Sequence, residues 1–330
     1  MLNRVLRKLT RELVLKLFRI SCVAALFFSV LGYFGTFHRY GELSSHFRVQ
    51  YLIIAIGSSV GFACFRAWRW LIASVVCVLL NGAVVVPGHL LPMSVMSGRG
   101  AGPKAHNFRV LLSNVLYRNR NYRLVTDLVR TENPDVVILQ EATSEWLEAL
   151  KELSTSYPYS RREPENVGTI ACFSRYPLED VDATITDRAK PWMIITKVNI
   201  GGKAVSLISI HPPPPVSRTG LPNRNEQFAV TAAIARLLPA PMMVVGDLNT
   251  SPWSPYFSRF ISESGLVSTR KGFGVLPTWP TYLPPMMIPI DHCLVSPDIK
   301  VVNCRTGSDV GSDHLPLVVD LLIPGAEGNQ

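Results

Sequence analysis

Cysteine is scarce in this chain, and the positions of the few cysteines exclude two kinds of stabilised domain. The 330 residues contain six, three of which lie in apolar runs before residue 80. The others, Cys172, Cys293 and Cys304, have neither the spacing of a disulfide framework nor that of a zinc site. A single bridge between Cys293 and Cys304 remains an alternative, but we expect buried free thiols.

Acidic side chains are almost absent from the first 103 residues. This segment holds two of the 24 Asp and Glu but 11 of the 33 Lys and Arg, so it carries the whole formal charge of +9. Residues 104–330 are neutral overall. A sequence pI near 9.4 would otherwise indicate a nucleic-acid-binding protein. The uneven distribution assigns the basic excess to the N-terminal segment instead.

Three apolar runs occupy that segment, at 20–37, 51–65 and 70–87. A hydrocarbon core about 30 Å thick requires roughly 20 apolar residues per helix. The first and third runs qualify, whereas the second does so only when it is extended back to 48–65. A signal peptide would explain the first run alone, and no small-residue cleavage pattern follows it. We therefore expect a membrane anchor over 1–95, with buried helices of a soluble domain as the alternative.

Basic residues flank these runs unevenly. Six lie in the N-terminal arm, and Arg66 and Arg69 separate the second run from the third. Because Lys and Arg favour the cytoplasmic side, three spans would deliver the chain to the outer face. The prediction is a multi-pass cell-membrane protein with a Gly-rich linker (96–107), an extracytoplasmic catalytic domain (108–324) and a tail (325–330). The side reverses if the second run does not span.

From residue 108 onward, short apolar strands alternate with amphipathic helices. This mixture predicts an α/β sandwich, in which helices cover two packed sheets. The expected strands are 108–116, 134–141, 168–174, 192–200, 203–211, 242–247, 290–296 and 315–322, and the expected helices are 120–132, 144–153 and 223–238.

Polar side chains that can do chemistry lie at the ends of these strands. Asp and Asn often stabilise turns there. Turn chemistry does not explain a glutamate ending "VVILQE" or a histidine ending "VSLISIH". We therefore expect a shared site where strand ends from two sheets converge. Its members are Asn114, Glu141, His211, Asp247, Asn249, Asp291, Asp313 and His314.

The motifs around these residues occur in a characteristic order. "SNVL", "LQE", "SIHP", "VGDLN", "PIDH" and "SDHLP" extend over roughly 108–322. This order resembles the endonuclease/exonuclease/phosphatase superfamily, whose fold is the deoxyribonuclease I-like two-sheet α/β sandwich. Bacterial membrane-anchored members with N-terminal spans are the most similar set. The resemblance implies an enzyme that hydrolyses phosphate esters by metal-assisted, in-line attack of water.

The resemblance also implies a role for each site residue. Glu141 would be the main Mg²⁺ ligand, a hard carboxylate for a hard cation, with Mn²⁺ as the alternative ion. Asp313 would support a metal, and Asn114 would complete the metal or phosphate contact.

Five further residues would carry the chemistry itself. Asp247 would orient or deprotonate the attacking water, and Asn249 would hold that water or donate to the phosphoryl oxygen. His211 and His314 would donate hydrogen bonds to developing negative charge. Asp291 would pair with His314 and raise its pKa. Either Asp247 or His314 would act as the base.

Other polar residues have plainer explanations. His292 points to the opposite face of its strand from Asp291, so we expect it to pack in the core. Trp279, in "TWP", is either a core tryptophan or an aromatic residue near the site. Arg224 is expected on a solvated helix face, with a phosphate contact as the alternative.

The substrate is the least determined property. A neutral domain tethered outside the cell suits a lipid-linked phosphate or pyrophosphate at the bilayer, and no protein partner is expected. A membrane-anchored nuclease is the second hypothesis, and the logarithm of its activity would fall linearly with the logarithm of the salt concentration. A non-catalytic envelope binding or resistance protein is the third, although such a protein has no reason to keep Glu141, Asp247 and His314 together.

Overall fold

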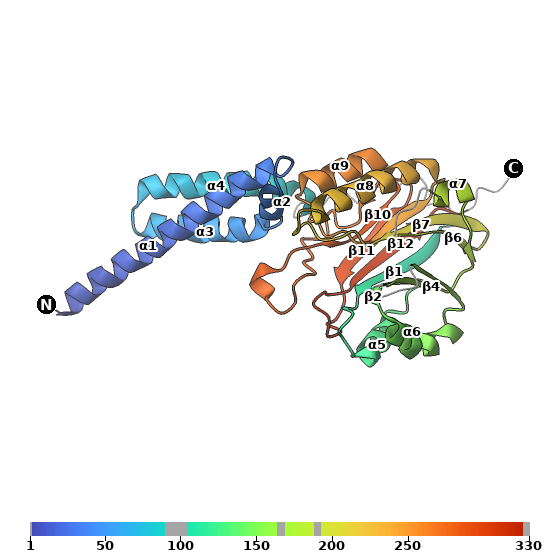
Figure 1. The fold of residues 1–330 in the computed structure, drawn as a ribbon. Coiled ribbons are helices and arrows are strands. Elements are labelled where there is room, and N and C mark those ends of the chain that lie inside the picture. Colours follow the sequence, from blue (N-terminus) through green and yellow to red (C-terminus); the bar gives the residue numbers. More distant parts are fainter. Residues whose placement is uncertain (1, 90–104, 164–168, 188–192, 326–330) are drawn as a thin grey trace. The chain divides into compact units, whose positions relative to one another are not determined.

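The computed structural model describes residues 2–89, 105–163, 169–187 and 193–325 (Figure 1). It contains two compact units, a helical unit up to residue 88 and an α/β unit formed by most of the remaining chain. Most of the predicted linker, 96–107, lies outside the described residues. Its last two residues instead open the first strand of the α/β unit, which begins at His106.

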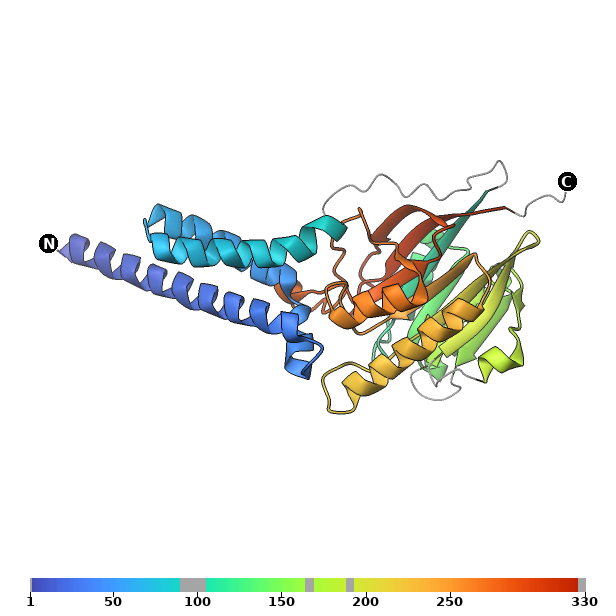
Figure 2. The ribbon, with the colours of Figure 1, turned by 90° about the horizontal axis from the view of Figure 1, so that it is seen from above.

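The helical unit places three long helices side by side (Figure 2). Two segments are long and apolar enough to cross a membrane, Leu9–Phe34 and Trp68–Gly88. A third span results only if α2 and α3, which are bent by 64° relative to each other, count as one. The second run is therefore again the uncertain span. The elements are α1 (Leu2–Leu31), η1 (Gly32–Phe34), α2 (Arg39–Ser45), α3 (Arg48–Cys64) and α4 (Trp68–His89).

A buried arginine connects the helices of this unit. Arg48, the first residue of α3, donates to the Ser29 carbonyl of α1 at 2.7 Å and to the Asn81 side chain of α4 at 3.4 Å. Its guanidinium also lies 4.2 Å from the ring centroid of Tyr33. An ionisable side chain among apolar helices is costly unless it is satisfied in this way. The contact therefore favours one arrangement of the three helices.

The α/β unit consists of two six-stranded mixed sheets, as the sequence predicted. One sheet has the order β11-β12-β1-β2-β4-β3 and the other β5-β6-β7-β8-β10-β9. The first sheet comprises β1 (His106–Asn114), β2 (Val136–Ala142), β3 (Tyr159–Glu163), β4 (Thr169–Ser174), β11 (Lys300–Thr306) and β12 (Leu317–Ile323). The second comprises β5 (Leu178–Glu179), β6 (Met193–Ile200), β7 (Lys203–Ile210), β8 (Met242–Asp247), β9 (Val267–Ser268) and β10 (Asp291–Val295).

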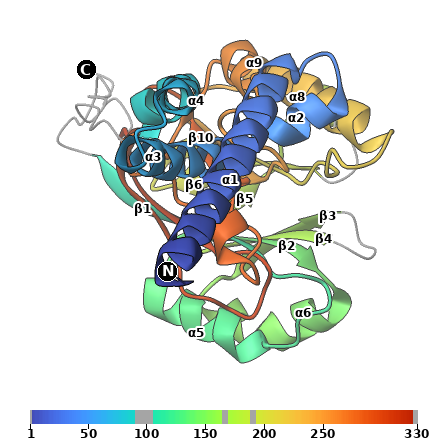
Figure 3. The ribbon, with the colours of Figure 1, turned by 90° about the vertical axis from the view of Figure 1, so that its left-hand side faces the viewer.

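Three apolar layers hold this unit together, one between the sheets and one beneath the covering helices on each side, and Figure 3 shows those helices on opposite sides of the unit. The inner faces of both sheets share one core, which includes Val110, Ile138 and Val245. The first sheet is covered on its outer face by α5 (Tyr122–Glu132) and α6 (Ser144–Ala149). The second is covered by α8 (Gly220–Leu237) and α9 (Pro255–Ser264). Central strands buried on both faces read as continuous apolar runs, which is why β8 was recognisable in the sequence.

Edge strands and short elements were missed. The strands β3, β5, β9 and β11 and the helices α7 (Ala183–Thr186) and α9 were not predicted. The sequences of β3, "YSRRE", and β11, "KVVNCRT", are charged and lack a clear alternation. Edge strands carry such charges because charges discourage pairing with other chains. The same property hides them from a search for apolar strands. The cysteines are free, as expected, and Cys172, Cys293 and Cys304 are buried.

Gly246, on β8, lies close both to the neighbouring strand β7 and to Gln140 of the opposite sheet. A Cβ atom there would lie 1.9 Å from the Ile210 carbonyl oxygen and 2.8 Å from Nε2 of Gln140. The last paired residues of β7 and β8 are Ser209 and Val245. Gln140 supplies the next link from the opposite sheet, since it donates to the Ile210 carbonyl and accepts from the Asp247 N–H, both at 2.7 Å.

Replacing Gly246 with alanine should therefore destabilise the α/β unit. We expect the free energy of unfolding to fall by about 3 kcal/mol, because backbone has to move and overpacking costs of this size are typical. Thermal and urea unfolding of the full-length protein would measure the change. Gly57→Ala is the control, because nothing lies within 4 Å of a Cβ at that position. Equal unfolding midpoints for Gly246→Ala and the wild type would contradict the packing argument.

Candidate active site

Most of the predicted site residues lie at the ends of central strands of the two sheets. Asn114 ends β1, and Asp247 ends β8. Asp291 begins β10, which runs antiparallel to β8 and pairs Asp291 directly with Asp247. His211 directly follows β7, and His314 lies three residues before β12. The strand ends thus converge, as the sequence pattern indicated.

Glu141 owes its position to a β-bulge. The pairing of β2 with β4 shifts register between Leu139 and Ala142, and Glu141 has a left-handed φ of 58°. A bulge of this kind redirects a side chain out of the regular alternation. The carboxylate accepts from Asn114 Nδ2 at 3.0 Å and from the Tyr117 N–H at 3.2 Å. The glutamate is partly exposed, so its carboxylate keeps room for another ligand.

Asp247 lies in contact with several other buried polar groups of the site. Its side chain folds back to accept from the Asn249 N–H at 2.9 Å. Its other oxygen, Oδ2, lies 3.4 Å from Asn114 Nδ2, 3.6 Å from His211 Nε2 and 3.7 Å from His314 Nε2. The residue is 2% exposed. Asp247 therefore connects the amide beside Glu141 with both histidines.

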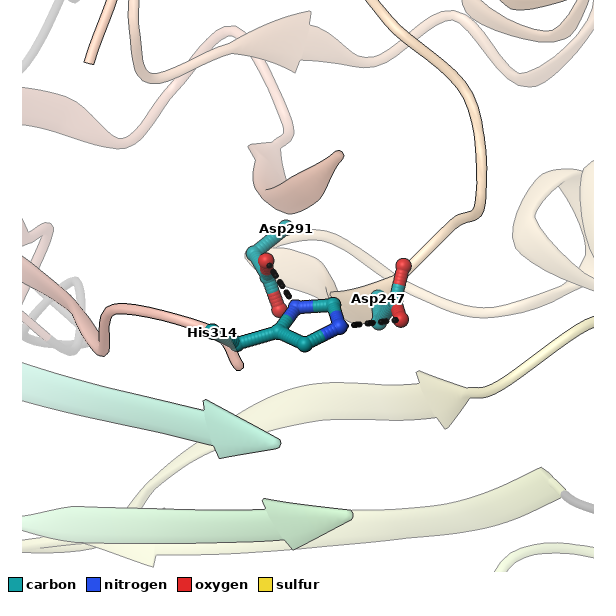
Figure 4. A group of neighbouring side chains, drawn as sticks. All are labelled: Asp247, Asp291 and His314. Atoms are coloured by element: carbon teal, nitrogen blue, oxygen red, sulfur yellow. Dashed lines mark hydrogen bonds and ion pairs between the residues drawn. The ribbon is translucent and has the colours of Figure 1, made fainter. Parts of the chain in front are cut away.

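Asp291 and His314 form the best-defined pair of the site (Figure 4). His314 Nδ1 lies 2.8 Å from Asp291 Oδ2, and both residues are buried. Burial by itself lowers the pKa of His314, but the Asp291 and Asp247 carboxylates outweigh burial and raise it to about 10. Burial likewise raises the pKa of Asp291, and the His314 cation more than compensates and lowers it. The pair is thus an imidazolium held by a carboxylate.

His211 has the same electrostatic tendency. Burial lowers its pKa, whereas the hydrogen bond and the charge of Asp247 raise it above the ordinary histidine value. Two histidines with raised pKa values therefore flank one buried carboxylate. Such donors suit the negative charge that develops on phosphoryl oxygens during hydrolysis.

Two groups of side chains offer metal ligands. Ligand atoms of Asp247, Asp291 and His314 lie within 4.8 Å of one another, and such a group could hold an ion. The Nδ1 atom of His314 is however engaged by Asp291. Glu141 provides a partly exposed carboxylate, the kind of oxygen ligand that Mg²⁺ prefers. The Glu141 carboxylate thus fits a hard divalent cation.

Asn114 contacts Glu141, whereas Asp313 contacts Trp279. The amide nitrogen of Asn114 faces Glu141, and its oxygen accepts from the Leu116 N–H at 3.1 Å. This geometry favours Asn114 as a residue that positions the carboxylate. The Asp313 carboxylate accepts from the Trp279 indole N–H at 3.1 Å. Trp279 is partly exposed, and its ring centroid lies 6.4 Å from that of His314. Trp279 is therefore an aromatic residue at the site.

Asn249 is held from two sides. It has a left-handed φ of 49°, which asparagine tolerates better than most residues. Its amide donates to the Pro212 carbonyl at 3.0 Å, and its own carbonyl accepts from Arg224 at 3.1 Å. Arg224 is buried, with its guanidinium 5.4 Å from the ring centroids of both Phe228 and Tyr256. The expectation of a solvated helix face for Arg224 was wrong, because Arg224 fixes this loop.

Sequence reasoning missed several supporting residues. Gln140 links the two sheets beside Asp247, and the buried Arg270 donates to the carbonyls of Asp291 and Leu276. Ser312 donates to the Asn114 carbonyl at 2.7 Å and accepts from the His314 N–H. Gln140 and Ser312 adjoin a motif residue in the sequence, which is their only signal, whereas Arg270 lies 21 residues from Asp291 and gives none. His292 is buried against the Phe257 ring at 4.6 Å, which confirms its predicted packing role.

Comparisons with known proteins agree with this architecture. The sequence model of the Endonuclease/Exonuclease/phosphatase family matches residues 106–314. A search of curated protein sequences gave no match.

Solved structures of similar fold include three useful relatives. A family protein from Bacteroides thetaiotaomicron has a TM-score of 0.54 at 18% identity, covering 67% of this chain and 100% of its own. A protein of the family from Beutenbergia cavernae DSM 12333 has a TM-score of 0.53 at 21% identity, and the match covers 67% of this chain and 72% of that protein. D. rerio TDP2, complexed with single strand DNA product, has a TM-score of 0.52 at 15% identity, and the match covers 65% of this chain and 98% of that protein. At these identities the likeness concerns the fold.

Proposed function

Because the chain belongs to the Endonuclease/Exonuclease/phosphatase family, a family of phosphate-ester hydrolases, we propose that it is a membrane-anchored, metal-dependent phosphodiesterase or phosphatase. Its substrate in this proposal is a lipid-linked phosphate or pyrophosphate at the outer face of the cell membrane. Enzymes of the family commonly use divalent metal ions, and we take Mg²⁺ as the ion of this chain, with Mn²⁺ as a substitute.

One observation carries the proposal, the continuous chain of polar contacts from Asp291 through His314 and Asp247 to Asn114 and Glu141. With His211, which lies 3.6 Å from Asp247, it joins a carboxylate suited to a divalent cation to two histidines suited to phosphoryl oxygens. Burying so many charged groups at one point is expensive unless they act together. A purely structural role would not explain why the chain buries these charged groups together.

The roles of the residues follow from their charges. A divalent cation held by Glu141, with Asp313 in support, would neutralise the phosphate and act as a Lewis acid. His314 lies between the carboxylates of Asp291 and Asp247, which hold it as a cation. We therefore assign the base to Asp247, which takes a proton from the attacking water. The new P–O bond forms as the bond to the leaving group breaks, and that group, an alcohol from a phosphate ester or a phosphate from a pyrophosphate, takes its proton from solvent.

The remaining side chains stabilise the anion and the water. His211 and His314 donate hydrogen bonds to phosphoryl oxygens, where negative charge grows. Asn249, locked by Pro212 and Arg224, holds the attacking water beside Asp247. Asn114 keeps the Glu141 carboxylate in place.

The lipid substrate and the location rest on the N-terminal unit and on charge. At least two helices are apolar enough to span a membrane, and the domain that follows is neutral overall. Neutrality argues against tracking a long phosphate backbone. With α2 and α3 counted as one span, the helices cross the membrane three times, and we place the α/β unit outside the cytoplasm because Lys and Arg flank the first helix and the turn at Arg66 and Arg69. Cleavage by a protease added to intact cells tests that placement.

A substrate comparison tests the function. Full-length protein in lipid nanodiscs would be assayed with Mg²⁺ and with EDTA against bis-p-nitrophenyl phosphate, a lipid pyrophosphate and plasmid DNA. We expect turnover that EDTA abolishes, with the lipid pyrophosphate preferred over DNA. Efficient DNA hydrolysis that falls linearly with log salt, without turnover of lipid phosphate, would replace the proposal with an anchored nuclease.

A further inference from the structure

An uncharged segment adjoins the site. Between Lys271 and Asp291 the chain contains no Asp, Glu, Lys, Arg or His, although this stretch forms no membrane-spanning helix. Within it, residues 281–287, here called the apolar loop, include the short helical turn η3 (Pro284–Met286). In Figure 1 the apolar loop is the orange segment that stands away from the two sheets.

The tip of the apolar loop exposes its large side chains. Tyr282 is 72% exposed, Leu283 48% and Met286 39%. Single exposed apolar residues are ordinary, but three within five positions, with two exposed prolines between them, form a patch. The prolines restrict the backbone and so limit how far these side chains can fold back.

The base of the apolar loop is fixed to the site. Thr281 donates its N–H to the Asp313 carbonyl at 3.0 Å and its hydroxyl to the Ser312 carbonyl at 2.8 Å. Two residues earlier, Trp279 donates to the Asp313 carboxylate. The exposed Tyr282 therefore directly follows a residue bonded to the segment that carries His314. Whatever binds the tip is therefore connected, through Thr281, to the segment that carries Asp313 and His314.

The side chains at the tip of the apolar loop indicate what kind of partner it can bind. With no Lys or Arg it cannot neutralise the phosphates of a nucleic acid. A tyrosine beside leucine and methionine suits the boundary between headgroups and acyl chains, where amphipathic rings gather. The same chain carries helices able to span a bilayer. We propose that the apolar loop inserts Tyr282, Leu283 and Met286 into the lipid surface and so presents a lipid-linked phosphate ester to the site. Only the substrate part of this proposal rests on the proposed function.

Quenching by spin-labelled lipids tests the insertion without any catalysis. Full-length protein would carry Cys64→Ser, which removes the exposed cysteine, and either Tyr282→Cys or Val302→Cys. Val302 is a matched control, an apolar residue 49% exposed on the edge strand β11. A fluorophore at each position would be examined in nanodiscs containing doxyl-labelled phospholipid. We expect at least twofold quenching at position 282 and none at 302. Equal signals at both positions would overturn the proposal.

Activity separates lipid presentation from a structural role. Tyr282→Ser, Leu283→Ser and Met286→Ser combined should lower kcat/KM on a lipid pyrophosphate in nanodiscs at least tenfold, mainly through KM. The turnover of soluble bis-p-nitrophenyl phosphate by this triple variant should stay within twofold of the wild type. The control variant Val302→Ser should keep wild-type activity on both substrates. Equal losses on both substrates would show that the loop only supports the site. If the wild type hydrolyses neither substrate, the proposed function fails, while the quenching result still decides the insertion.

Discussion

Glu141→Gln is expected to lower Mg²⁺-dependent turnover by about 1,000-fold, because a Lewis-acid cation is worth several kcal/mol and each 1.36 kcal/mol is tenfold in rate. The amide keeps the shape of the side chain and removes the charge that would hold the cation. Glutamine keeps one of the two hydrogen bonds that Glu141 accepts from Asn114 and the Tyr117 N–H, and the side chain is partly exposed, so the fold should accept the change. The rate on bis-p-nitrophenyl phosphate across a Mg²⁺ titration measures the loss.

Glu148→Gln is the matched control for that experiment. Glu148 is 70% exposed and pairs with Lys151 on the surface, a kind of contact that contributes little. Its turnover and its Mg²⁺ midpoint should equal those of the wild type. If Glu141→Gln keeps wild-type turnover with an unchanged Mg²⁺ midpoint, the metal is not held by Glu141. The group of Asp247, Asp291 and His314 would then be the candidate metal site.

The pairing of Asp291 with His314 should appear as strong coupling between two substitutions. We expect His314→Gln to reduce kcat by about 100- to 1,000-fold, the usual loss for one donor to a developing oxyanion. Asp291→Asn removes the carboxylate that holds the imidazolium at 2.8 Å, so it should cost a similar factor. If the two residues act as one unit, the double variant should lose no more than the worse single variant.

His106→Gln serves as the control for this cycle, because His106 lies at the start of β1, at the opposite end of that strand from Asn114. Its kcat should be unchanged. Circular dichroism would establish that each variant is folded, since Asp291 and His314 are buried. Multiplicative losses in the double variant would show that the two residues act independently, and the assignment of Asp291 as the residue that holds His314 would be wrong.

The strand ends explain how much of the site the sequence could reveal. Asn114, Asp247 and Asp291 are predictable because each lies where an apolar run stops, and buried central strands are easy to recognise. Glu141 was recognisable as an anomaly, since glutamate is a poor turn former, but the bulge that redirects it depends on pairing with β4. The sequence alone carries no signal for that register shift.

Residues that act across the two sheets were beyond sequence reasoning. Gln140 reaches from β2 to Ile210 and Asp247, and Arg224 reaches from α8 to the Asn249 carbonyl. Both contacts join positions distant in the chain, so no local pattern encodes them. Arg224 in particular reads as a surface residue, because charged side chains are rarely buried. The edge strands were hidden for the related reason that their charges resemble those of loops.

The fold does not choose the substrate, because one architecture supports many reactions and function depends on the site. What distinguishes this chain is the combination of a complete polar site, a neutral α/β unit and apolar helices on the same polypeptide. The exposed tip at Tyr282 and Leu283 adds a feature that a soluble nuclease does not need. These properties together favour a substrate at a lipid surface.

The most direct test of the account is the hydrolysis of bis-p-nitrophenyl phosphate by the full-length protein in nanodiscs, measured with Mg²⁺, with EDTA and after Mg²⁺ is restored. The account predicts turnover that EDTA abolishes and Mg²⁺ recovers, and that His314→Gln lacks under all three conditions. Turnover that persists in EDTA, or that His314→Gln retains in full, would contradict it.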